Sequence, residues 1–156
     1  MILKIIGVIM NSQSVDRSLF VIANLTNLLL TCVFIFRVYA LKKAEYVSGL
    51  VIIFFSIPIL IAAVYNYSHA REWWTYILPM FLFLFLLVEL LLDYILKTDF
   101  RDTALLWPYL LVYYLGLMGM IGYSFLINKV YGFITLTTYF INLAATFFSY
   151  SKIGHN

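Results

Sequence analysis

The feature that most constrains this chain is an apolar run from Trp73 to Lys97, WWTYILPMFLFLFLLVELLLDYILK. It is long enough to cross a bilayer, since a transmembrane helix needs about 20 predominantly apolar residues. Its second half nevertheless carries two carboxylates, Glu89 and Asp93. A charge at the centre of a transmembrane helix costs about 2.5–3.5 kcal/mol on insertion scales, so such residues are rare and mostly face protein or water. Four residues apart, the two acids lie about 40° from each other around a helix and therefore share one face.

The composition of the whole chain agrees with a membrane protein. Of its 156 residues, 65% are hydrophobic and 11% are charged, whereas soluble domains carry about 25% charged residues. The net charge of +3 is too small to indicate a nucleic-acid partner. The single cysteine, Cys32, excludes an intrachain disulfide and lies inside an apolar run, where we expect it to pack as a small apolar residue.

Apolar runs separated by short polar clusters predict an all-α, single-domain bundle of five transmembrane helices. The predicted spans are residues 19–41, 46–65, 74–97, 104–127 and 131–150. Pro58 lies just past the middle of the second span, where a proline removes a backbone hydrogen bond and is expected to kink the helix. The apolar segment 1–10 is too short to cross, so we expect it to lie at the membrane interface or to pack against the bundle.

Two of the spans carry polar residues that we expect to face the interior of the bundle. Asn24, Asn27 and Thr31 follow the spacing i, i+3, i+7 and therefore lie on one face of the first span. Asn142 lies in the interior of the fifth span. Amide and hydroxyl side chains in lipid find partners on neighbouring helices, so these residues predict contacts between helices.

The fourth span carries three glycines, Gly116, Gly119 and Gly122. Residues three apart drift by about 60° around a helix, so the glycines form a slanted groove. Such a groove is typical of close helix packing. Contact between the glycine backbone and a ligand is the alternative.

The basic residues predict an orientation. With five spans, the N-terminal and C-terminal ends of the chain lie on opposite sides of the membrane. The side that holds the C-terminus carries Arg37, Lys42, Lys43, Lys97, Arg101 and Lys152, and the other side carries Lys4, Arg17, Arg71 and Lys129. This excess predicts an outside N-terminus and an inside C-terminus, in the cell membrane.

The depth of each residue in its span predicts a partner for Asp93. Glu89 lies roughly 5 Å and Asp93 roughly 10 Å to the inner side of the midplane, at a rise of about 1.5 Å per residue. On the same count Arg37 and Tyr109 come level with Asp93. We therefore expect a salt bridge or a shared water between Arg37 and Asp93.

Glu89 has different neighbours at its depth, namely Tyr113 and Asn142. Burial without a cation disfavours an ionised carboxylate, whereas a neighbouring cation favours it. We therefore expect Glu89 to exchange a proton or a cation while Asp93 keeps a fixed charge. The full set of candidate site residues is Glu89, Asp93, Arg37, Tyr113, Asn142, Asn27 and Tyr109.

Motifs for nucleotide binding, zinc proteases and paired cysteines are missing from the sequence, so it indicates no catalytic residue, no metal site and no cofactor. One function is the handling of a proton, a cation or a small solute at the acidic site. A second is a non-catalytic membrane subunit or assembly protein, in which the same residues fix the helix register. A third is a membrane-embedded enzyme with Glu89 and Asp93 as metal ligands, although the balance is against an enzyme. The expected partners are the lipid bilayer and either further copies of the chain or another membrane protein.

Overall fold

The computed structural model describes residues 11–98, 100 and 103–153, and the regular structure of these residues is helical. In chain order the helices are α2 (Ser12–Val38), α3 (Lys42–Phe54), α4 (Ser56–Ser68), α5 (Trp74–Glu89), the π-helix η1 (Leu90–Ile95), α6 (Leu106–Ile127) and α7 (Lys129–Ile153). Helices α3 and α4 form one span, as do α5 and η1, so the described residues contain five helices long and apolar enough to cross a membrane. The predicted fold class is confirmed. The segment 1–10, predicted to be interfacial, lies outside the described residues.

The first span begins at Ser12, earlier than the predicted residue 19. Asn11 caps the helix, because its side-chain oxygen accepts a hydrogen bond from the backbone N–H of Gln13 at 3.3 Å. The polar residues that precede the apolar run therefore continue the helix. This helix of 27 residues is about 40 Å long, so it exceeds the hydrocarbon core of about 30 Å.

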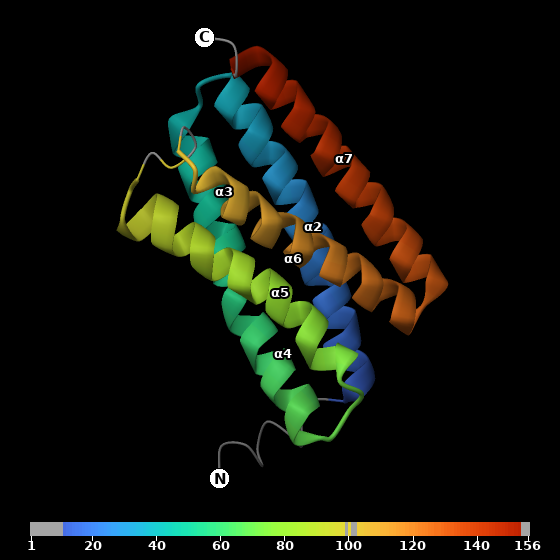
Figure 1. Cartoon of the computed structure of the whole chain (residues 1–156). Coiled ribbons are helices and arrows are strands. Elements are labelled where there is room, and N and C mark those ends of the chain that lie inside the picture. The colour runs from blue at the N-terminus through green and yellow to red at the C-terminus, as the bar shows by residue number, and fades with distance from the viewer. Residues whose placement is uncertain (1–10, 99, 101–102, 154–156) are drawn as a thin grey trace.

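The spans pack as a bundle in which the first and last helices, α2 and α7, lie side by side. Helices α5 and α6 also lie side by side and cross the direction of α2 obliquely (Figure 1). The start of α2 and the end of α7 lie at opposite ends of the bundle, as an odd number of spans requires (Figure 1).

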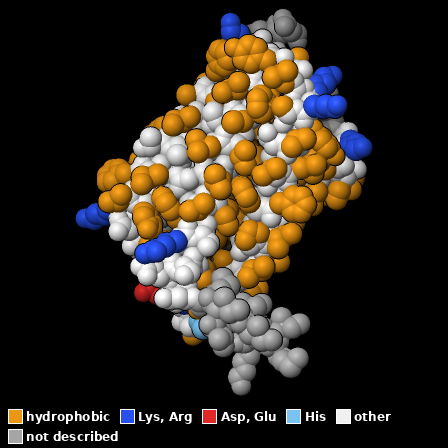
Figure 2. Space-filling view, turned by 180° about the vertical axis from the view of Figure 1, so that it is seen from behind, with side chains coloured by type: hydrophobic (Ala, Val, Ile, Leu, Met, Phe, Trp, Pro, Cys, Tyr) orange, Lys and Arg blue, Asp and Glu red, His pale blue; other side chains and the backbone are white. Residues whose placement is uncertain are grey.

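The distribution of polar and apolar side chains is that of a protein surrounded by lipid. Hydrophobic side chains spread over the middle of the face seen in Figure 2, and Lys and Arg lie near its edges. Within the described part of the chain, eight polar residues are buried inside: Thr26, Asn27, Asn66, Thr75, Ser124, Thr135, Asn142 and Ser149. In lipid, polar side chains stabilise a bundle by bonding to neighbouring helices.

The polar face of the first span meets α7. The Asn24 amide donates to Thr135 Oγ1 at 3.2 Å, and the Asn27 amide donates to Thr138 Oγ1 at 3.0 Å. The Thr138 hydroxyl in turn donates to Asn24 Oδ1 at 2.9 Å. The amide and hydroxyl side chains of the two helices therefore form one hydrogen-bonded group.

Two of the three glycines of α6 lie against the backbone of α5. A methyl group added at Gly116 would lie 3.2 Å from the Cα of Leu82, and one added at Gly119 would lie 3.0 Å from the carbonyl oxygen of Leu78. A methyl group at Gly122 would meet only a side-chain carbon of Leu78, at 3.8 Å. Gly116 and Gly119 therefore bring the two backbones together, and Gly122 has room.

The second span breaks at Phe55, between α3 and α4. Pro58 explains the break, because it has no backbone N–H to donate to the carbonyl oxygen of Phe54, and its ring would clash with that carbonyl in a regular helix. Helix α4 packs along α5, whereas α3 stays against α2 and diverges from α5. The divergence separates α3 from η1 at the end of the bundle where α2 ends.

The π-helix η1 was not predicted. Its wider turn is visible in the bond from the N–H of Leu96 to the carbonyl of Leu91, five residues earlier, at 2.9 Å. Short π-helical segments inside α-helices occur frequently at functional sites. Here the segment carries Asp93.

Candidate functional site

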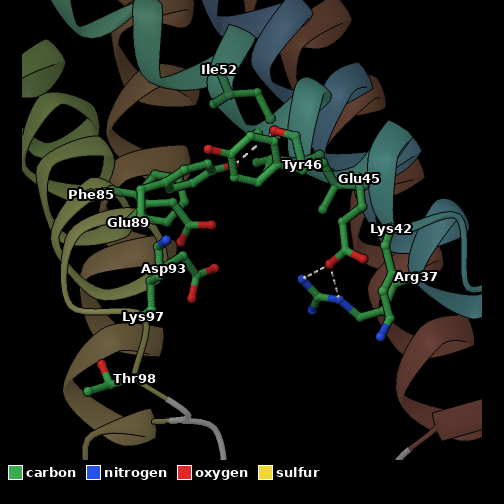
Figure 3. A pocket seen from close by; sticks show the side chains of 14 residues that line it. Arg37, Lys42, Glu45, Tyr46, Ile52, Phe85, Glu89, Asp93, Lys97 and Thr98 are labelled. Carbon is green, nitrogen blue, oxygen red and sulfur yellow. Dashed lines mark hydrogen bonds and ion pairs between the residues drawn. The ribbon is translucent and has the colours of Figure 1, made fainter.

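A cavity of about 720 Å³ lies between α3 and η1. One wall comes from the end of α2 and the first half of α3, and the other comes from α5 and η1 (Figure 3). Ligand sites for small molecules have volumes of about 300–1,000 Å³, so the cavity is of the size that holds such a ligand.

Both acids of the third span line this cavity. Glu89 is the last residue of α5 and Asp93 lies in η1, and each is partly buried. The Tyr109 hydroxyl of α6 donates a hydrogen bond to Glu89 Oε2 at 2.7 Å. The ring of Phe100, which is buried, packs on Tyr109 with 4.8 Å between the ring centroids. Tyr109 therefore holds one oxygen of Glu89 in a fixed position.

Arg37 lines the opposite wall but forms its salt bridge with Glu45, rather than with the expected Asp93. The distance from Arg37 Nη2 to Glu45 Oε1 is 2.8 Å, and the Nε of Arg37 donates to the same oxygen at 2.8 Å. The short connection between α2 and α3 places Glu45 directly beside Arg37, while Asp93 lies across the cavity (Figure 3). Glu45 lies in the helix that directly follows Arg37 along the chain, so residue depths in separate spans do not indicate this pair.

Tyr94 joins the two walls. Its hydroxyl donates to the backbone carbonyl of Tyr46 at 3.1 Å, and the two rings lie 5.1 Å apart. The Tyr94 hydroxyl occupies the space next to Gly49 that a side chain would fill. Tyr46 and Tyr94 therefore present aromatic rings to the cavity.

The remaining candidate residues lie outside the cavity lining. Asn142 donates to the Tyr113 hydroxyl at 2.7 Å, and both residues are buried. The Tyr113 ring stacks beside that of Tyr109 at 6.5 Å, so this pair supports the residue that binds Glu89. Asn27 belongs to the contact between α2 and α7.

A second polar cluster lies at the opposite end of the bundle, where α2 begins and α4 ends. Arg71 pairs with both oxygens of Asp16, at 2.8 and 2.9 Å. Tyr123 donates to Asp16 Oδ1 at 2.7 Å, and Arg71 also donates to Asn66 Oδ1 at 2.9 Å. The hydrogen bond to Asp16 raises the pKa of Arg71 above its ordinary value. The cluster ties α2, the α4–α5 connection and α6 together.

Sequence analysis assigned no role to these four residues. Asp16 lies in the polar segment before the first apolar run, and Arg71 lies between two spans and was counted only among the basic residues of its side. Their positions on the same side of the membrane were the only available signal for a pair.

Among the described residues, no group of three or more His, Cys, Asp and Glu side chains is arranged to hold a metal ion. Comparisons with protein-family models, curated proteins and solved structures found no match to this chain. The function is therefore inferred from the cavity itself.

Proposed function

We propose that this protein binds a cation or a small cation-bearing solute in the cavity between α3 and η1 and moves it across or within the membrane. The observation that carries the proposal is that Glu89 and Asp93, two acids in an apolar span, line the same cavity. Acids in transmembrane segments are costly and mark substrate or ion pathways.

Glu89 and Asp93 have different roles in this proposal. Glu89 receives the positive charge of the ligand, and Tyr109 orients its carboxylate for that contact. Asp93 adds a second negative charge nearby. On the facing wall, Arg37 pairs with Glu45. Lys42 and Lys97 also line the cavity, so its three acids face three basic residues, and the acids Glu89 and Asp93 share one wall.

The alternative is a non-catalytic subunit or assembly protein in which polar residues only fix helix register. The hydrogen-bonded group between α2 and α7 is an observation in its favour, because it holds two helices together without lining the cavity. A lock of that kind needs no access from water to Glu89, whereas a binding site does. A measurement of whether water reaches Glu89 therefore distinguishes the two functions.

Access and charge preference are measured by modifying a cysteine at Val33, which lines the cavity from α2. The native cysteine is first replaced, Cys32→Ala, and Val33→Cys is then reacted with two methanethiosulfonates that differ only in the sign of their charge. We expect the cationic reagent to react about tenfold faster, because the Glu89 and Asp93 carboxylates attract a cation into the cavity. Glu89→Gln should lower the ratio of the cationic to the anionic reaction rate. Glu72 is an exposed acid near the start of α5, and Glu72→Gln should leave the ratio unchanged.

Leu28→Cys, at an exposed position of the same helix, is the control for reagent in the surrounding detergent or lipid. If Val33→Cys reacts equally with both reagents, or no faster than Leu28→Cys, the proposed binding site is contradicted and the structural alternative is preferred.

A further inference from the structure

The cavity changes in character from its mouth to its inner end. Arg37, Lys42 and Lys97 lie at or just beyond the ends of their helices, near the surface of the membrane. Ile52 and Phe85 lie about 15 Å further in, at a rise of about 1.5 Å per residue. Ile52 is 2% exposed and Phe85 is fully buried. The inner end is therefore apolar and lies at the depth of the hydrocarbon chains.

Glu89 lies between these two regions. It is about 9 Å from the end of its span, on the same residue count. Figure 3 shows Glu89 next to Phe85, and the Lys97 side chain extends toward the carboxylates of Glu89 and Asp93. The carboxylates thus lie outside the apolar inner end, with Lys97 on the same wall and Arg37 and Lys42 on the facing wall.

Aromatic side chains line the cavity that holds the carboxylates. Tyr46 is exposed there and Tyr94 is partly exposed, whereas Phe85 is fully buried. The face of an aromatic ring attracts a cation within about 6 Å of its centroid. Rings beside a carboxylate suit an organic cation, which gains from both groups, better than a hydrated metal ion.

We infer that the ligand of this cavity is a lipophilic organic cation, with a compact apolar or aromatic body and one positive charge. Its body contacts the accessible rings of Tyr46 and Tyr94, and its charge lies against Glu89. This inference rests on the proposed cation site and names the class of its ligand. Burial of apolar area contributes about 25 cal/mol per Å², so the rings of Tyr46 and Tyr94 favour a cation with an apolar body over a small hydrophilic one. An anion of the same shape would be repelled, because its negative charge would lie against the Glu89 carboxylate.

Three probes separate these possibilities. Tetraphenylphosphonium and tetraphenylborate have the same shape and opposite charges, and tetramethylammonium has the positive charge without the apolar body. Binding of each to the purified full-length protein in a neutral detergent is measured by equilibrium dialysis. We expect saturable binding of tetraphenylphosphonium, no saturable binding of tetraphenylborate, and at least about tenfold weaker binding of tetramethylammonium.

Two variants assign the binding to the cavity. Glu89→Gln keeps the shape of the side chain and should weaken binding of tetraphenylphosphonium about tenfold or more. Asp93→Asn is the second variant in case Glu89→Gln does not fold, and should also weaken binding. Glu72→Gln removes an acid distant from the cavity and should bind as the parent does.

The outcomes distinguish the inference from the proposed function. Tetramethylammonium binding as tightly as tetraphenylphosphonium, and lost in Glu89→Gln, would overturn the lipophilic class and leave the cation site standing. Equal binding of tetraphenylphosphonium and tetraphenylborate would show partition into detergent and overturn the inference. Saturable binding of neither cation would overturn both.

Discussion

At the scale of single residues, the charged side chains inside the bundle form two groups at opposite ends. Glu89, Asp93 and the Arg37–Glu45 pair line a cavity, whereas Asp16 and Arg71 pair in a compact cluster. The side chain of Asp16 is 14% exposed and that of Arg71 is 20% exposed. Three hydrogen bonds hold Asp16, so we assign its cluster to the stability of the fold, and Glu89 and Asp93 belong to the proposed binding site.

The first prediction follows from this assignment. Asp16→Asn removes the charge that Arg71 and Tyr123 bind, so the guanidinium loses its counter-ion. We expect the free energy of unfolding to fall by about 1.5–3 kcal/mol, the range for hydrogen bonds to charged groups. The measurement is denaturant unfolding in detergent, followed by tryptophan fluorescence.

Tyr123→Phe is the matched control for Asp16→Asn, because it removes one hydrogen bond and leaves the ion pair. Its expected cost is about 1 kcal/mol. A larger loss in Tyr123→Phe than in Asp16→Asn would contradict the assignment of the cluster to an ion pair that stabilises the fold.

At the scale of helices, the shape of the cavity depends on two breaks in regular α-structure. Pro58 turns α3 away from α5, and η1 carries Asp93 in a wider helical turn. The contact between α5 and α6 keeps the wall that holds Glu89 in place. That contact is close at Gly116 and Gly119.

The second prediction uses the glycines of α6, which should respond with opposite signs. Gly119→Ala brings a methyl group to within 3.0 Å of the Leu78 carbonyl, so it should destabilise the protein. Gly122→Ala meets only an ordinary contact at 3.8 Å, so it should stabilise by up to about 1 kcal/mol through helix propensity. Melting temperatures in detergent check both variants. If both are less stable than the parent, the prediction that Gly119 lies against the backbone of α5 while Gly122 has room is contradicted.

The elements of the fold were predictable to different degrees. Five spans follow from long apolar runs, and the kink follows from Pro58, because both depend on local sequence. The π-helix and the Arg37–Glu45 pair could not be predicted from local sequence, because they depend on how neighbouring helices meet. The two acids stood out because charge is rare in an apolar run, whereas the partner of Glu89, Tyr109, is a residue that is common in membrane spans.

At the scale of the whole molecule, the cavity and the Asp16 cluster lie at opposite ends of the five spans. The cavity is lined by the end of α2 and the start of α3, and the cluster joins α2, the α4–α5 connection and α6 at the other end. A ligand would therefore enter from the side of the membrane that holds the C-terminal end of α7.

The third prediction tests this topology. In the Cys32→Ala background, Lys43→Cys lies at the start of α3 and Glu72→Cys lies between α4 and α5, and both positions are exposed. An impermeant thiol reagent applied to intact cells should label one of them, and the other should react only after the membrane is opened. Labelling of both from one side would contradict the five-span arrangement.

The central claim is that the Glu89 carboxyl group contacts the positive charge of the ligand. Infrared difference spectroscopy measures this most directly, because the carboxyl and carboxylate bands change when a cation binds to the group. Tetraphenylphosphonium and, in parallel, tetramethylammonium are added to the parent protein, to Glu89→Gln and to Glu72→Gln. We predict a cation-induced carboxyl change that is present in the parent and in Glu72→Gln and missing in Glu89→Gln. An unchanged difference spectrum in Glu89→Gln would contradict the claim.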